Sequence, residues 1–136
     1  MKTKLALAAI VLSLTSSSAF AEWVQVYPTP PEYNLYYDSA SVTRQNNLGG
    51  VLSMASYVSP QTDPNVLGGS VSFYSRSEMM IFDCTTREVA GIGDFMFHSG
   101  QFAGGDVVFS ASAYDPTRRP VNPGTANEAM YQVACR

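Results

Sequence analysis

The sequence contains few of the residues that usually carry chemistry. It has one histidine, His98, and two cysteines among its 136 residues. It contains no C-x-x-C pair, D-x-D-x-D-G calcium loop, H-E-x-x-H zinc helix or G-x-S-x-G nucleophile turn. In the segment GIGDFM, Met96 replaces the third glycine of a dinucleotide loop, so Gly91 and Gly93 more simply indicate a bulge in a strand. These absences predict that the chain is not an enzyme and binds no cofactor and no metal.

The isolated histidine and the scattered acidic residues leave little basis for catalysis. Because the sequence shows no evident partner for His98, we expect it to be an exposed residue at the end of a strand. A glycosidase-like pair of carboxylates is left open but is not supported by any spacing. A hydrolase is therefore the third of the functional alternatives.

The sequence also lacks a hydrophobic run long enough to cross a membrane. The longest, Leu5–Leu14, would rise about 15 Å as a helix, half of a ~30 Å hydrocarbon core. It follows two lysines and precedes Ala19 and Ala21, the pattern of a signal peptide cleaved after Ala21. No cysteine is present there to carry a lipid. We predict a cleaved signal peptide at 1–21 and one soluble domain at 22–136, exported to the periplasm or the outer-membrane surface without lipidation.

The predicted domain has no lysine. Its six arginines face eleven acidic residues, which gives a formal charge of −5. Such a chain is a poor partner for nucleic acid or anionic lipid. We therefore predict no nucleic-acid partner and no stable membrane insertion.

Two cysteines in an exported protein allow only one intramolecular pairing. An oxidising compartment favours a structural disulfide between Cys84 and Cys135. It would close a loop of about fifty residues, for which the chain-entropy model gives about 4 kcal/mol of stability. A redox or metal-binding pair is the alternative, without a C-x-x-C motif or a nearby histidine to support it.

Alternation of apolar and polar residues predicts a small antiparallel sheet of about five to six strands. The last three form a meander joined at QFAGGD, and the strand at 50–58 is expected to be half exposed, with Ser53 facing water. We expect a glycine-containing loop at 47–50 and a mobile loop at 59–69. The predicted strands are 22–28, 34–38, 50–58, 70–84, 87–100 and 106–114.

The period changes to that of a helix at the C-terminus. Thr125 and Glu128 form a capping box. So short a helix is unstable alone in water, so it must pack on the sheet. Cys135 would then fasten it over Met80 and Phe82, and the fold class is α+β. The apolar residues at helical spacing are Ala126, Ala129, Met130 and Val133.

Two groups of residues are candidates for protein recognition. Tyrosines crowd around the proline-rich turns near the N-terminus, and tyrosine is favoured in interfaces, although these rings can equally roof a small core. Arginines form a second candidate, a small cationic patch, for which solvated surface residues are the alternative. The candidates are Tyr27, Tyr33, Tyr36 and Tyr37, and Arg76, Arg118 and Arg119.

Several short motifs follow one another along the chain. Trp23 is followed by YYDSASVTR, by Tyr74-Ser75, by Asp83-Cys84 and by PGTANEAMYQVAC. This order resembles the surface-adhesin protein E family of Gram-negative bacteria. The C-terminal signature P-G-[ST]…E…V-C of that family is matched by Pro123, Gly124, Thr125, Glu128, Val133 and Cys135.

The resemblance implies a small antiparallel sheet with a disulfide-linked C-terminal helix, in an envelope protein whose relatives bind host extracellular-matrix proteins. The chain departs from the known adhesins in two ways: its signal lacks a lipidation cysteine, and Arg76 is accompanied by Glu78 and Asp83 in a stretch that is basic in the family. We therefore predict a non-enzymatic, adhesin-like protein that binds a protein ligand. The alternative is a periplasmic protein-binding or inhibitor module with no adhesive role.

Overall fold

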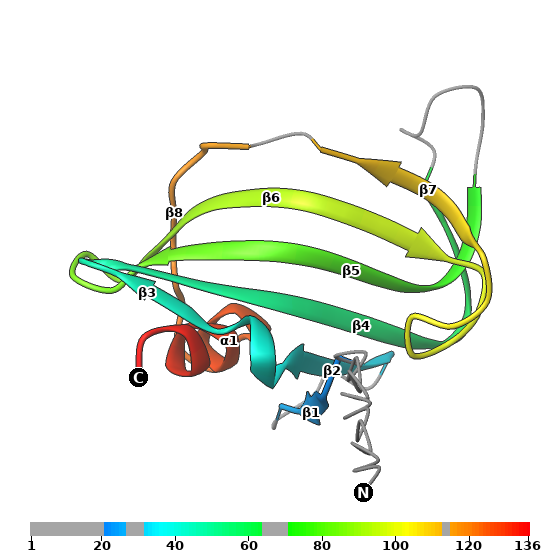
Figure 1. The fold of residues 1–136 in the computed structure, drawn as a ribbon, viewed down its shortest axis with the longest axis horizontal. Coiled ribbons are helices and arrows are strands. Elements are labelled where there is room, and N and C mark those ends of the chain that lie inside the picture. The colour runs from blue at the N-terminus through cyan, green and yellow to red at the C-terminus, as the bar shows by residue number, and fades with distance from the viewer. Residues whose placement is uncertain (1–20, 27–31, 64–70, 113–114) are drawn as a thin grey trace, which may run out of the picture.

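The computed structural model describes residues 21–26, 32–63, 71–112 and 115–136, which form one antiparallel sheet with a single C-terminal helix (Figure 1). Residues 1–20 of the predicted signal peptide, Tyr27 and residues 64–69 of the predicted mobile loop lie outside this part of the chain. The elements are β1 (Trp23–Gln25), β2 (Tyr33–Asp38), the 3-10 helix η1 (Ser39–Ser41), β3 (Thr43–Gln45), β4 (Leu48–Asp63), β5 (Val71–Asp83), β6 (Glu88–His98), β7 (Val107–Ala111), β8 (Arg119–Pro120) and α1 (Ala126–Ala134).

The sheet is built around three long strands, β4, β5 and β6. Its order is β1-β2-β4-β5-β6-β7, while β3 pairs with β4 and β8 pairs with β6. β2 and β3 follow one another along the outer edge of β4, and β7 and β8 do the same along β6. The sheet thus has eight strands among the described residues, more than predicted because β3 and β8 each have two or three residues.

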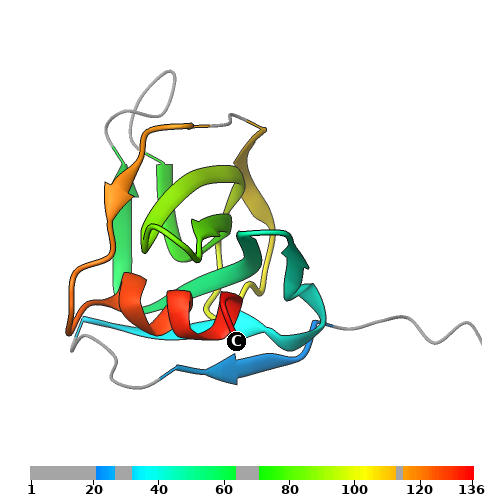
Figure 2. The same cartoon turned by 90° about the vertical axis from the view of Figure 1, so that its left-hand side faces the viewer.

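The sheet curls, so that β7 and β8 rise on the side away from β1 and β2 (Figure 2). α1 lies at the end of the molecule where the β3–β4 and β5–β6 turns are found (Figures 1 and 2). The Cys84–Cys135 disulfide joins α1 to the end of β5, with the two Cα atoms 5.5 Å apart. The predicted fold class and the predicted disulfide are both confirmed.

The main core lies between α1 and the sheet. Phe82 is fully buried and meets the Tyr131 ring edge-on at 5.9 Å between ring centroids. The Tyr131 hydroxyl donates to the Cys84 carbonyl at 3.0 Å, beside the disulfide. Buried aliphatic side chains complete this core: Val26, Leu35, Val51, Met80, Val89, Val121, Ala129, Met130, Val133 and Ala134.

The start of α1 is capped as predicted, with one difference in detail. The Thr125 side chain accepts from the Glu128 amide at 3.3 Å. The Glu128 carboxylate reaches back to the amide of Gly124, one residue before the cap, at 3.3 Å. Arg87 of the β5–β6 turn forms an ion pair with the same carboxylate. The cap thus also joins the helix to the sheet.

Two bulges in β6 bring Ile92 onto the α1 side of the sheet. The alternate residues of β5 that face α1 pair with residues spaced three apart on this part of β6: Phe82 with Val89, Met80 with Ile92 and Glu78 with Phe95. An extra residue is therefore inserted on each side of Ile92, as Gly91 and Gly93 suggested. Ile92 packs on the main core although simple alternation would point it away.

β4 is covered on both faces in its middle, which corrects the prediction of a half-exposed strand. Ser53, expected to face water, is 4% exposed and donates to the Glu78 carbonyl. Met54, on the other face, is fully buried. β4 also continues through residues 59–63, which were predicted as loop, and the predicted loop at 47–50 is a turn at 46–47 followed by strand.

The loop between β6 and β7 folds back over the face opposite α1. The buried Ser75 hydroxyl donates to the Gly100 carbonyl at 2.6 Å and accepts from the Ala103 amide at 2.9 Å. The Ser56 hydroxyl accepts from the Phe102 amide at 3.1 Å. Phe102 and Ala103 have positive φ angles, a conformation that costs roughly 1–2 kcal/mol for a non-glycine residue. The serine bonds offset this cost and fix the loop.

Candidate functional site

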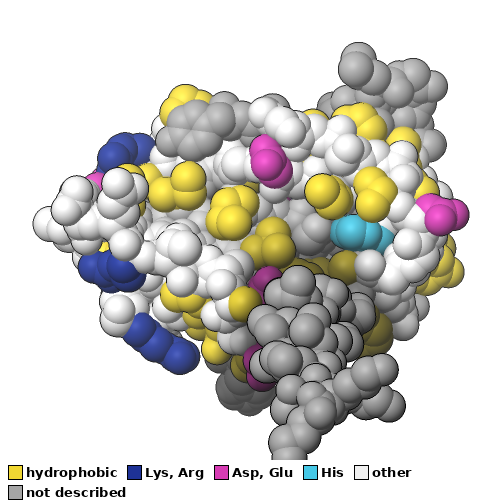
Figure 3. Space-filling model, in the orientation of Figure 1, with side chains coloured by type: hydrophobic (Ala, Val, Ile, Leu, Met, Phe, Trp, Pro, Cys, Tyr) yellow, Lys and Arg dark blue, Asp and Glu magenta, His cyan; other side chains and the backbone are white. Residues whose placement is uncertain are grey.

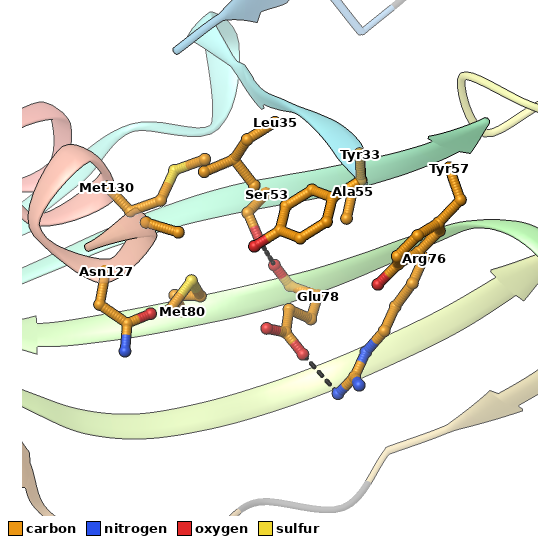
Figure 4. A pocket seen from close by; sticks show the side chains of 11 residues that line it. Tyr33, Leu35, Ser53, Ala55, Tyr57, Arg76, Glu78, Met80, Asn127 and Met130 are labelled. Atoms are coloured by element: carbon orange, nitrogen blue, oxygen red, sulfur yellow. Dashed lines mark hydrogen bonds and ion pairs between the residues drawn. The ribbon is translucent and has the colours of Figure 1, made fainter. Parts of the chain in front are cut away.

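A cavity of about 140 Å³ opens between the first turn of α1 and strands β2, β4 and β5. We call it the α1 cavity (Figure 4). Apolar and polar side chains line it in roughly equal measure. They are Tyr33, Leu35, Ser53, Ala55, Tyr57, Arg76, Glu78, Met80, Ala126, Asn127 and Met130.

A charged pair marks one end of the α1 cavity. Arg76 and Glu78 are alternate residues of β5, so their side chains share a face, and they form an ion pair at 2.6 Å (Figure 4). The guanidinium also lies over the rings of Phe95 and Phe97, 5.3 and 5.6 Å from their centroids. These contacts hold Arg76 in one place and leave the cavity without net charge.

Arg76 nevertheless has an unsatisfied donor. Its Nε is buried and has no hydrogen-bond partner within the described residues. Leaving a buried donor unpaired typically costs about 1–3 kcal/mol, so this position of Arg76 is held at some cost in stability.

Two tyrosines form the wall of the α1 cavity. The rings of Tyr33 and Tyr57 lie 5.3 Å apart between centroids, and Tyr57 meets Phe73 edge-on. Burial raises the pKa of the Tyr33 phenol, and the carboxylates of Glu32 and Glu78 add to the effect. Burial also raises the pKa of Tyr57, against the opposing charge of Arg76. Both hydroxyls are therefore neutral at pH 7 and can donate as well as accept.

The other predicted recognition residues do not join this cavity. Tyr36 packs edge-on against Phe102 of the β6–β7 loop, with ring centroids 5.5 Å apart. Tyr37 packs against the main core. Both are half-buried, so the described tyrosines proposed from the sequence lie in three different places rather than in one cluster.

The arginines do not form one cationic patch. Arg118 bonds to the Asp83 carboxylate at 3.0 Å, and Arg119 lies 4.0 Å from Asp115. Since Asp83 is seven residues from Arg76 along β5, the two sites are about 23 Å apart. On the face shown in Figure 3, cationic side chains lie toward the end with the β3–β4 turn, whereas hydrophobic ones are scattered over the rest.

Asp83 organises the β5–β6 turn. The amides of Thr86 and Thr85 and the side chains of Arg118 and Asn47 all donate to its carboxylate, at 3.0–3.1 Å. The Thr86 amide and the Arg118 guanidinium make the largest contributions to a pKa far below the usual range. Asp83 therefore remains ionised and supports the turn that carries Cys84.

The position of His98 corrects the sequence-based prediction of an exposed histidine. The residue is 7% exposed and lies between Ser75 of β5 and Val107 of β7 in the sheet, and its Nε2 lies 3.1 Å from the Ser77 hydroxyl. This is the only hydrogen bond of the ring within the described residues. A histidine and a serine alone lack the carboxylate that orients the base of a hydrolytic triad.

Acidification should destabilise the protein through His98. Burial lowers its pKa, so between pH 7 and pH 5 the unfolded chain takes up a proton that the folded chain resists. The free energy of unfolding is therefore highest above the unfolded-state pKa of about 6.5 and decreases as the pH is lowered below that value. Urea unfolding at pH 7 and pH 5 should show this loss in the wild type and a smaller one in His98→Gln. Equal pH dependence in both proteins would contradict the assignment.

The described residues contain no group of three or more His, Cys, Asp or Glu side chains that could hold a metal ion. Within the same residues, no helix has the length and apolarity needed to cross a bilayer.

Comparison with known proteins supports one family. A family model described as surface-adhesin protein E matches residues 23–136. The chain belongs to this family. No curated protein sequence matches the chain significantly.

Solved structures of protein E from Haemophilus influenzae have the same fold as this member of the adhesin E family. Crystal form II gives a TM-score of 0.54 at 16% identity, covering 82% of this chain and 95% of that chain. Another structure of H. influenzae protein E gives 0.52 at 14% identity, covering 83% and 92%. Protein E from a non-typeable strain gives 0.50 at 15% identity, covering 84% of each chain.

Sequence reasoning found only part of the α1 cavity in this adhesin E domain. Tyr33 and Arg76 were candidates for other reasons, whereas Tyr57 and Asn127 were not. Asn127 follows the helix cap, and Tyr57 lies on β4 beyond two small residues. The periodicity of the strand and of the helix that carry them was visible in the sequence. It did not indicate that β2 and α1 would meet beside these two residues.

Proposed function

We propose that this adhesin E family protein is an exported, non-enzymatic envelope protein that binds extracellular-matrix or other proteins. The family match over 23–136 carries the proposal, because this is a family of surface adhesins. The signal-like segment at 1–21 and the disulfide support export to an oxidising compartment. Exposed hydrophobic side chains near the β6–β7 loop, including Phe102 and Val107, offer contact surface for a protein.

The second candidate is a periplasmic binding or inhibitor module. The observation that favours it is the lack of a cysteine in residues 1–21, so that no lipid can attach there. Fractionation of cells separates the two, since a protein confined to the periplasm does not meet host matrix.

A solid-phase assay against immobilised matrix proteins tests the adhesin function. We expect saturable binding at physiological salt that changes little up to about 0.5 M salt, because the candidate arginines Arg76, Arg118 and Arg119 are each paired with an acidic residue. Serum albumin is the control surface. If the folded, oxidised protein binds no matrix protein saturably, the adhesin proposal fails and the periplasmic module remains.

A further inference from the structure

The volume of the α1 cavity limits what can enter it. At about 140 Å³ it is close to a cavity of about 150 Å³ that accommodates benzene in another protein. One leucine, methionine or phenylalanine side chain fits such a space. A disaccharide or a folded turn of peptide does not.

The floor of the α1 cavity selects an apolar group. Leu35, Met80 and Met130 line it and are 6%, 5% and 1% exposed. They come from β2, β5 and α1, so three parts of the chain fix the floor. Methionine side chains adapt to irregular partners, which suits a site for an inserted side chain.

The rim selects a neutral polar group beside that side chain. Arg76 and Glu78 neutralise one another, so neither an anion nor a cation is attracted by net charge. A neutral main-chain group therefore fits this rim better than a charged one, because it brings no charge near Glu78. Asn127 at the start of α1 can donate or accept at the opposite side of the opening (Figure 4).

We infer that the α1 cavity receives one apolar side chain of a protein partner, whose adjacent main-chain amide forms a hydrogen bond with the Asn127 side chain at the start of α1. The inference rests on the proposed protein-binding function and adds the place and chemistry of recognition. A buried apolar anchor in a small pocket with a polar rim is the arrangement that carries most energy in protein interfaces.

Capped amino acids are suitable probes because each presents one side chain between two amide groups. N-acetyl-leucinamide and N-acetyl-phenylalaninamide should shift the methyl NMR signals of Met80 and Met130 in the oxidised, exported protein. Dissociation constants of about 1 mM are expected for ligands of this size. N-acetyl-glycinamide, which lacks a side chain, and methyl glucoside should not shift them. No shift with the first two probes, or an equal shift with the glucoside, overturns the inference.

Filling the cavity should remove the binding. Ala126→Leu places a larger side chain at the cavity wall, whereas Gln132→Leu adds the same side chain at an exposed position of α1 that does not line this cavity. We expect probe affinity to fall more than tenfold in the first variant and to be unchanged in the second. Equal affinity in both variants contradicts the assignment.

Asn127→Ala tests the hydrogen bond without depending on the filling variant. It removes the amide at the opening, so we expect about five- to tenfold weaker binding of both probes, the value of one hydrogen bond. Gln132→Ala, at an exposed position of the same helix that does not line the cavity, is the matched control and should have no effect. Unchanged affinity in Asn127→Ala contradicts the role of this amide.

The same variants distinguish this inference from the proposed function. If a matrix protein binds the wild type and Ala126→Leu alike, the cavity is not its anchor site and the inference fails while the adhesin function stands. If no matrix protein binds but the capped amino acids do, the adhesin function fails and the apolar-anchor site stands.

Discussion

Replacement of Cys135 by serine is expected to lower the free energy of unfolding by about 2–4 kcal/mol. The disulfide joins residues 51 apart in sequence, and opening that loop gives the unfolded chain more conformations. For a domain of this size the loss corresponds to a melting temperature lower by roughly 10 °C. Thermal unfolding followed by circular dichroism measures the change.

The structure also predicts which part of the molecule loosens first. α1 is too short to be stable alone, so without the disulfide its last turn depends on Val133, Ala134 and the Tyr131 bond to Cys84. Hydrogen exchange should accelerate at the amides of α1 before those of β4–β6. The double variant Cys84→Ser/Cys135→Ser controls for effects of a free thiol. A melting curve that overlays that of the oxidised wild type would refute the role of the crosslink.

Replacement of Gly49 by alanine is expected to destabilise the protein by about 2–3 kcal/mol. A Cβ atom at this position of β4 would lie 2.2 Å from the Ala134 carbonyl oxygen and 3.2 Å from the Cys84 sulfur. The last turn of α1 thus rests directly on the backbone of β4. The added Cβ would collide with a backbone carbonyl, and the disulfide holds the helix close to the sheet. The clash can therefore be removed only if α1 moves, at the energetic cost typical of an overpacked core.

Gly93→Ala is the matched control for Gly49→Ala. Both glycines lie inside long strands, but a Cβ at Gly93 would meet Met79 at 3.5 Å, an ordinary contact. We expect Gly93→Ala to stay within about 1 kcal/mol of wild type in denaturant unfolding. If Gly49→Ala lowered the free energy of unfolding by no more than Gly93→Ala, the close approach of α1 to β4 would be contradicted.

The helix and its covalent attachment follow from local sequence. The spacing of Ala129, Met130 and Val133, the Thr125 cap and the presence of only two cysteines predicted α1, its buried face and the disulfide, and all are confirmed. The helix and its cap depend on residues within one or two helical turns of each other. The disulfide depends on there being only two cysteines, which can pair in one way. The antiparallel class and the family followed in the same way, from alternation and from motif order.

The α1 cavity and the burial of His98 depend on contacts between distant parts of the chain. His98 lies between β5 and β7 with its ring beside Ser77, and no local pattern encodes that strand pairing. The cavity requires β2 to reach β4 and β5 beside the start of α1. Its residues lie up to about a hundred positions apart in the sequence.

The sequence by itself determined the antiparallel sheet, the capped helix and the crosslink between them, because each depends on periodicity, on capping chemistry or on a unique pairing. Only the tertiary structure decided which side chains of β6 share a face. The bulges on either side of Ile92 turn its side chain toward α1. A register shift of one residue moves every later side chain of the strand to the other face of the sheet, until a second shift moves them back. Strand register is a property of paired strands, so a pattern within one strand does not contain it.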